Sequence, residues 1–310
     1  MSFRIFVEPQ QGASYSQLAS FAKEVDDTGF DALFRSDHYV AMGSASGLPG
    51  PTDAWVTLAG WARDTTRLRL GTLVTSATFR LPGPLAIAVA QVDEMSGGRV
   101  EIGLGAGWYT VEHTAYGIPF PALGERFDRL EEQLTILDGL WRTPVGETYS
   151  FAGRHYQLEN SPALPKTIQQ PGVPIIVGGM GPSRTPALAA RFAAEFNTPF
   201  APPEAAQIAF ERVNAACTQS GRDPQTLIKS SALTVVCGRT PEEISRRVER
   251  AGWDEAALRR AGACGTPQEV AERLVLWRTA GAARLYLQVL DLDDLGHLSD
   301  LAEACQLVDA

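Results

Sequence analysis

The chain has 310 residues, 45% of them hydrophobic, which suffices for one large core and lies near the size limit for a single one. The formal net charge is −9, and the lysines and arginines are scattered, which argues against nucleic acid as a partner. No apolar run approaches the ~18 residues that a membrane-spanning helix needs. We therefore expect one domain over residues 1–310, with no nucleic-acid or membrane partner.

The four cysteines all lie beyond residue 200 and form no Cys-x-x-Cys pair, so we expect reduced thiols. The first residues, Met1–Arg4, lead directly into a strand pattern without the architecture of a signal peptide. Both features favour a cytoplasmic protein. The histidines and carboxylates show no metal-ligand spacing such as His-Glu-x-x-His, so we expect no bound metal.

Strand-like and helix-like segments alternate along the chain. Eight segments are typical of buried strands, at residues 3–7, 31–36, 68–75, 100–105, 174–178, 194–198, 228–237 and 284–290. Segments with a helical apolar face or helix-start signals lie at residues 14–28, 124–141, 241–251 and 266–280. Strands alternating with helices predict a parallel sheet, and eight units predict its closure into a (β/α)8 TIM barrel.

Two segments interrupt this alternation. Residues 41–51 are small and glycine-rich, and because they closely follow a strand end we expect them to cover a ligand. Residues 144–171 contain a predicted hairpin, with strands at 148–151 and 155–158, followed by a proline-rich loop. We interpret both as insertions at the C-terminal face of the barrel.

Polar residues follow the second strand directly, as Ser36-Asp37-His38. A single histidine is more often structural, but a position just past a strand end and beside Asp37 favours a role in proton transfer near neutral pH. Glu112 and His113 follow the next glycine-rich strand end. They either begin a solvated helix or face the same mouth as His38.

Glycines end two further strands. Gly103-Leu104-Gly105-Ala106-Gly107-Trp108 lacks the third glycine of a dinucleotide loop, so it is either a tight turn or a backbone that a flat ligand approaches closely. Gly178-Gly179-Met180-Gly181-Pro182-Ser183 precedes a predicted helix, and its N–H groups suit a phosphate. A purely structural turn is the alternative there.

These motifs together resemble the luciferase-like flavin and deazaflavin oxidoreductases, in the branch that depends on coenzyme F420. The resemblance rests on motifs in the family's order across residues 3–200, namely Ser36–His38, Leu70–Thr75, Phe79–Pro82, Asp93–Arg99, Gly103–Trp108 with Glu112 and Tyr116-Gly117, Arg126–Glu132 and Pro174–Gly179. Beyond residue 200 the match is looser, although Gly265–Val270 fits. The set is specific to the superfamily and discriminates poorly between cofactors.

The resemblance implies a barrel that holds a deazaflavin ring in its C-terminal mouth. It places His38 and Asp37 beside the ring, a non-prolyl cis peptide at Leu73–Val74 behind it, and the phosphate at Gly178 and Gly179. The implied cofactor-binding set is Asp37, His38, Thr72, Leu73, Val74, Thr75, Gly105, Ala106, Gly107, Trp108, Gly178, Gly179, Met180 and Gly181. A homodimer is compatible with the resemblance, since dimers are common among relatives, but the sequence does not determine the oligomeric state.

The expected activity is hydride transfer between coenzyme F420 and a small organic substrate, with His38 and Glu112 as catalytic residues. Trp108 stands where sugar-phosphate dehydrogenases of the family carry an acidic glutamate, so neither that substrate nor that proton donor carries over. Tyr39, Tyr109, Glu112 and His113 remain unranked candidate donors. The alternatives are an FMN-dependent monooxygenase on the same fold, and a flavin-binding barrel without turnover.

Overall fold

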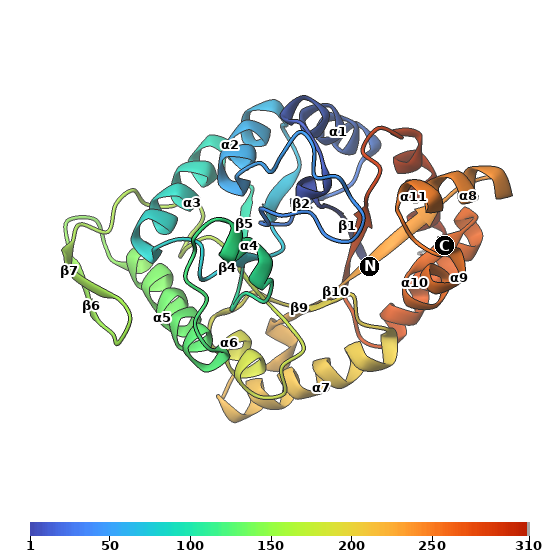
Figure 1. Ribbon diagram of the computed structural model, residues 1–310. Coiled ribbons are helices and arrows are strands. Elements are labelled where there is room, and N and C mark those ends of the chain that lie inside the picture. Colours follow the sequence, from blue (N-terminus) through green and yellow to red (C-terminus); the bar gives the residue numbers. More distant parts are fainter. Residues whose placement is uncertain (309–310) are drawn as a thin grey trace.

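The computed structural model describes residues 1–308 and shows a closed barrel of eight parallel strands surrounded by helices (Figure 1). The barrel strands are β1 (Ser2–Val7), β2 (Ala32–Arg35), β3 (Arg69–Thr72), β5 (Val100–Gly105), β8 (Ile175–Gly178), β9 (Glu195–Pro199), β10 (Ile228–Cys237) and β12 (Arg284–Val289). Each barrel strand pairs with the next one in chain order, including β9 with β10 and β10 with β12, and the pairing of β12 with β1 closes the ring. The predicted (β/α)8 fold is confirmed; the single domain stays a prediction.

Long helices pack around the barrel, and their starts follow the sequence signals. They are α1 (Tyr15–Thr28), α2 (Ala54–Asp64), α3 (Pro82–Ser96), α5 (Leu123–Arg142), α6 (Arg184–Phe192), α7 (Pro203–Gln219), α10 (Pro267–Thr279) and α11 (Gly296–Val308). Ser14 caps α1 and Thr266 caps α10, each in a reciprocal capping box. All four predicted helices are confirmed, with ends that shift by at most one residue.

The third predicted strand, at residues 68–75, is wrong in its second half. β3 ends at Thr72, the peptide bond between Leu73 and Val74 is cis, and a two-residue strand β4 (Thr75–Ser76) follows and pairs with β5. The cis bond interrupts the regular extended backbone that a continuous strand requires. Its position agrees with the one that the family resemblance implies.

The insertions differ in kind. The hairpin β6 (Tyr149–Ala152) and β7 (Gln157–Ser161) projects at the periphery of the barrel (Figure 1). Residues 41–51 contain neither helix nor strand. After β10 the chain adds α8 (Pro241–Arg250), α9 (Glu255–Ala261) and β11 (Ala263–Gly265), of which α9 and β11 were not predicted. These three elements share a small apolar core and form what we call the α8–α9 lobe.

A cluster of buried charges occupies the barrel interior near the N-terminal ends of the strands. Arg4 of β1 donates to both carboxylate oxygens of Glu101, at 2.7 and 3.0 Å, and to the hydroxyl of Tyr286 at 3.2 Å. Arg69 also pairs with Glu101, and Arg284 pairs with Glu195. Complementary partners offset the cost of removing these ions from water. The residues that the sequence predicts for the functional site lie at the opposite end, after the C-terminal ends of the strands.

Three further features bear on the class of protein. Within residues 1–308, no helix has both the length and the apolar character to cross a membrane. The same part of the chain has no cluster of metal-ligating side chains. Cys217, Cys237, Cys264 and Cys305 are buried thiols.

Candidate functional site

His38 and Glu112 form the best-defined polar pair at the barrel mouth. His38 lies three residues past the end of β2, and Glu112 lies on the short helix α4 (Thr110–Ala115). The Glu112 oxygens lie 2.9 and 3.1 Å from the His38 Nδ1 atom, and Oε2 accepts the Tyr39 N–H at 2.9 Å. The Glu112 side chain is 1% exposed and that of His38 16%. A carboxylate only accepts, so Nδ1 carries the hydrogen, and Nε2, which makes no hydrogen bond within residues 1–308, can act as a base.

Asp37 is directed away from this pair and is fully buried. Its carboxylate accepts hydrogen bonds from the Thr75 hydroxyl at 2.8 Å and from the Arg80 guanidinium. Arg80 also pairs with Asp53, the residue that caps α2, and donates to the Tyr39 hydroxyl at 3.2 Å. Asp37 therefore fixes the loop that carries His38, while its own contact with a cofactor stays a proposal.

Aromatic rings surround His38. The centroids of Trp108 and Tyr109 lie 5.8 and 6.1 Å from the imidazole centroid, both in edge-to-face geometry. The Tyr109 hydroxyl donates to the Ala41 carbonyl at 3.2 Å, which ties the glycine-rich segment to the mouth. Trp108 is 65% exposed. An indole that is both exposed and packed beside the imidazole is placed to contact a bound molecule.

The structure ranks the four candidate proton donors. Both ring nitrogens of His113 are engaged, with the Tyr109 carbonyl at 2.7 Å and the Thr78 hydroxyl at 2.6 Å. Burial, reinforced by the charge of Asp37, raises the pKa of the Tyr39 hydroxyl. Both groups are thus held by contacts within the protein, and so is the Tyr109 hydroxyl, which donates to the Ala41 carbonyl. Glu112 reaches the mouth only through His38, which leaves Nε2 of His38 as the group that can exchange a proton with a ligand.

The glycines of β5 have a packing role. A Cβ atom on Gly103 would lie 2.6 Å from a Val74 methyl group, and one on Gly105 would lie 3.0 Å from the other. Gly107 has a φ of 80° and faces the Ser76 hydroxyl. These glycines make room for the backbone around the cis bond, so close approach to a ring is not needed to explain them. Contacts of Gly105, Ala106 and Gly107 with a cofactor stay predictions.

The two residues joined by the cis bond lie in surroundings that suit contact with a flat ligand. Leu73 and Val74 are partly exposed, whereas the flanking Thr72 and Thr75 are buried. The Thr75 Oγ1 atom lies 3.2 Å from Thr72 Oγ1, and the Thr72 hydroxyl donates to the Gly103 carbonyl at 3.1 Å. Two apolar residues on a hydrogen-bonded support at the barrel mouth fit one face of a flat, largely apolar ring system.

The glycine-rich turn after β8 leads into α6 as predicted. Ser183 caps α6 without a side-chain hydrogen bond, so the N–H groups of the first turn are left to other acceptors. Gly179 has a φ of 140°, and its N–H is already bonded to the Asn197 carbonyl at 3.0 Å. Met180 is partly exposed. The turn and the first N–H groups of α6 therefore suit a phosphate.

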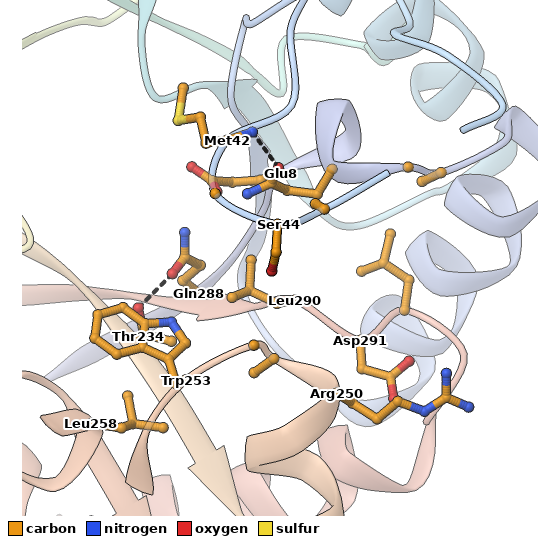
Figure 2. Close-up of a pocket in the computed structure, with 18 of the residues that line it drawn as sticks. Glu8, Met42, Ser44, Thr234, Arg250, Trp253, Leu258, Gln288, Leu290 and Asp291 are labelled. Carbon is orange, nitrogen blue, oxygen red and sulfur yellow. Dashed lines mark hydrogen bonds and ion pairs between the residues drawn. The ribbon is translucent and has the colours of Figure 1, made fainter. Parts of the chain in front are cut away.

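A cavity of about 820 Å³ opens beside this site, and we call it the mouth cavity (Figure 2). It lies between the segment Met42–Ser46 and the α8–α9 lobe, above the C-terminal ends of β1, β10 and β12. Of the predicted site residues only Trp108 lines it. Residues 42–46 of the glycine-rich segment line this cavity, and the prediction that residues 41–51 cover a ligand stays a prediction.

Two functional candidates were missed in the sequence. Glu8 directly follows β1 and lines the mouth cavity, so the rule that drew attention to His38, a polar residue past a strand end, also applies to it. Burial raises the pKa of Glu8, and the nearby His38 opposes that rise. Arg80 lies within the recognised Phe79–Pro82 motif, but only the structure shows that it links Asp37 to Asp53.

Two kinds of known protein are similar to this chain in sequence, F420-dependent dehydrogenases and a monooxygenase. An F420-dependent glucose-6-phosphate dehydrogenase from Microbacterium testaceum is 34% identical over 184 residues, which cover 59% of this chain and 52% of that protein. The chain thus spans about half the length of the curated relatives of this kind. A pyrimidine monooxygenase from Stutzerimonas stutzeri is 28% identical over 281 residues, covering 85% of this chain and 73% of that protein.

Solved structures agree on the fold. An F420-dependent secondary alcohol dehydrogenase, solved with an F420-acetone adduct, superposes with a TM-score of 0.86 at 18% identity, covering 99% of this chain and 98% of that one. The family model described as luciferase-like monooxygenase matches residues 1–261. With that match extending over most of the barrel, the chain belongs to the luciferase-like monooxygenase family.

Proposed function

We propose that this protein is an oxidoreductase that uses coenzyme F420 to transfer a hydride to or from a small organic substrate. The observation that carries the proposal is the His38–Glu112 pair, which engages Nδ1 of His38 and leaves Nε2 for a ligand. His38 and the Leu73–Val74 bond follow the neighbouring strands β2 and β3 at the same end of the barrel. The F420-dependent dehydrogenases among the relatives support the choice of cofactor.

The residues present fit this cofactor. Leu73 and Val74 would contact one face of the deazaflavin ring, and the turn Gly178–Gly181 with the first turn of α6 would hold its phosphate. When bound, the coenzyme accepts or donates a hydride at its C5 carbon. Trp108 and Tyr109 pack beside His38, and with a ligand bound they would limit the access of water to the imidazole.

His38 accepts or donates the proton whose transfer accompanies that of the hydride. When a carbon bearing a hydroxyl group is oxidised, Nε2 takes the hydroxyl proton as the carbonyl forms, and the imidazolium is stabilised by Glu112 at Nδ1. In the reverse direction the imidazolium returns the proton to the carbonyl oxygen. Glu112 acts through His38 and is therefore a positioning residue.

An anaerobic assay tests this function. The protein is mixed with oxidised F420 and a panel of alcohols and amines, and with reduced F420 and a panel of imines and unsaturated carbonyls. We expect turnover without oxygen, and a loss of about 100-fold or more in kcat in His38→Gln with F420 binding retained. Turnover that survives unchanged in His38→Gln would contradict the assignment of His38.

An FMN-dependent monooxygenase is the second candidate, favoured by the pyrimidine monooxygenase that matches most of this chain. The two candidates differ in their need for oxygen. If product forms only with reduced FMN and molecular oxygen, and contains an oxygen atom from the gas, the monooxygenase is correct. If F420 binds but no substrate in either panel reacts, a binding protein without turnover becomes the better account.

A further inference from the structure

The mouth cavity has a strongly acidic lining. Four carboxylates line it, from Glu8, Glu249, Asp291 and Asp293, whereas one cationic side chain does so, that of Arg250. Arg250 is 68% exposed and lies 3.9 Å from the Asp291 carboxylate, so even with Arg250 counted the lining has more acidic than basic side chains. A cavity that holds an excess of one charge attracts ligands of the opposite charge and repels those of the same charge.

Aromatic side chains accompany these carboxylates. Trp108, Trp253 and Phe200 all line the cavity and are all at least 39% exposed. Figure 2 shows Trp253 on one side of the cavity near the hydrogen-bonded pair Thr234–Gln288, with Arg250 and Asp291 on the other. Indole faces attract organic cations through their ring quadrupole. Carboxylates combined with indoles are therefore suited to a positively charged organic group.

Glu8 connects this cavity to the proposed catalytic site. It directly follows β1 and lines the cavity, and the charge of His38 acts on its carboxyl group. A cation held by Glu8 would thus lie near the imidazole. Within residues 1–308, the lining offers no second arginine and no lysine that would hold a phosphate group there.

We propose that the mouth cavity selects organic cations, such as protonated amines, and rejects phosphorylated substrates. This inference rests on the proposed function, because it assigns the substrate class of the same site. It separates this chain from its glucose-6-phosphate dehydrogenase relatives, whose substrate carries a phosphate.

Three probes that share one apolar body and differ in charge test the inference. Benzyltrimethylammonium, benzyl alcohol and benzyl phosphate are titrated by calorimetry into the protein, with and without F420. We expect the ammonium probe to bind at least about tenfold more tightly than the phosphate, and added salt to weaken its binding. Equal or tighter binding of benzyl phosphate would overturn the inference.

Variants locate the binding site. Glu8→Gln combined with Glu249→Gln keeps side-chain shape and removes two charges, and we expect the ammonium preference to fall severalfold. Glu147→Gln, on an exposed loop before the β6–β7 hairpin, removes one charge elsewhere and should leave it unchanged. Thermal unfolding confirms that each variant is folded. An undiminished preference in the double variant would contradict the assignment.

The same titrations separate the two proposals. If the ammonium preference holds but F420 does not bind, the cofactor assignment fails and the charge selectivity stands. If F420 binds and benzyl phosphate is preferred, the cofactor assignment stands and the charge selectivity is wrong.

Discussion

At the scale of single residues, the proposed chemistry depends on one imidazole held by one carboxylate. His38 and Glu112 are 74 positions apart in the chain, yet the sequence already selected both because each follows a strand end of a parallel barrel. The sequence did not predict that the Glu112 carboxylate is hydrogen-bonded to Nδ1 of His38. Four candidate donors remained unranked because their hydrogen-bond partners come from different loops, as Arg80 does for Tyr39.

Replacing Glu112 by Gln tests this arrangement. The amide oxygen can still accept the Nδ1–H of His38, but the negative charge that stabilises the imidazolium is lost. We expect kcat to fall about 10- to 100-fold with little change in KM. In the oxidation direction the acid limb of the pH–rate profile should move to lower pH, because the protonated imidazole loses its partner.

A purely structural role for Glu112 gives a different result. In that case Glu112→Gln would lower the melting temperature or the amount of active protein, and the pH–rate profile of the remaining activity would match that of the wild type. Glu112→Asp serves as the conservative comparison, since it keeps the charge and shortens the side chain.

At the scale of elements, short sequence patterns predicted the strands and helices of the barrel well, but they did not predict the segments that form the mouth cavity. Capping residues such as Ser14 and Thr266 are read from a few adjacent positions, so α1 and α10 were predicted closely. The α8–α9 lobe was only partly predicted, because α9 has seven residues with Leu258 as its buried side chain and β11 has three residues. The mouth cavity, formed between that lobe and Met42–Ser46, could not be predicted from either segment.

The junction of α11 with β10 predicts a pH dependence of stability. His297 is buried, and its Nε2 atom accepts the backbone N–H of Cys237 at 2.9 Å. Burial, with a contribution from the charge of Arg247, lowers the pKa of His297 to about 3. Since the unfolded chain protonates this histidine near pH ~6.5, stability should fall as pH drops from there toward 3.

The variant His297→Gln isolates this contribution. Its amide oxygen can accept the same N–H but does not titrate. The free energy of unfolding, measured in urea at several pH values, should fall by about 2–4 kcal/mol more in the wild type than in the variant between pH 6.5 and 3. Parallel pH profiles for the two proteins would show that His297 is not the responsible group.

At the scale of the whole molecule, the two ends of the barrel have separate tasks. The N-terminal end holds paired ions, in which the Glu101 carboxylate forms ion pairs with both Arg4 and Arg69. Despite its burial, these arginines lower the pKa of Glu101 to about 2. The stabilisation from Glu101 is thus complete above the ordinary carboxyl pKa and is lost as pH falls through 2.

We expect Glu101→Gln to lower the free energy of unfolding at pH 7 by about 3 kcal/mol, because it leaves the buried Arg4 without a counter-charge. Urea unfolding provides the measurement. The control is Glu125→Gln on α5, which removes a half-exposed pair with Arg129 and should cost less than about 0.5 kcal/mol. Equal effects in the two variants would argue against a stabilising role for the ionic cluster.

The measurement that tests the central claim most directly is a fluorescence titration of the purified protein with coenzyme F420 and, separately, with FMN. The account predicts micromolar or tighter binding of F420, weaker binding of FMN, and retention of F420 binding in His38→Gln. A preference for FMN would contradict the deazaflavin assignment and support a monooxygenase that depends on reduced flavin and oxygen.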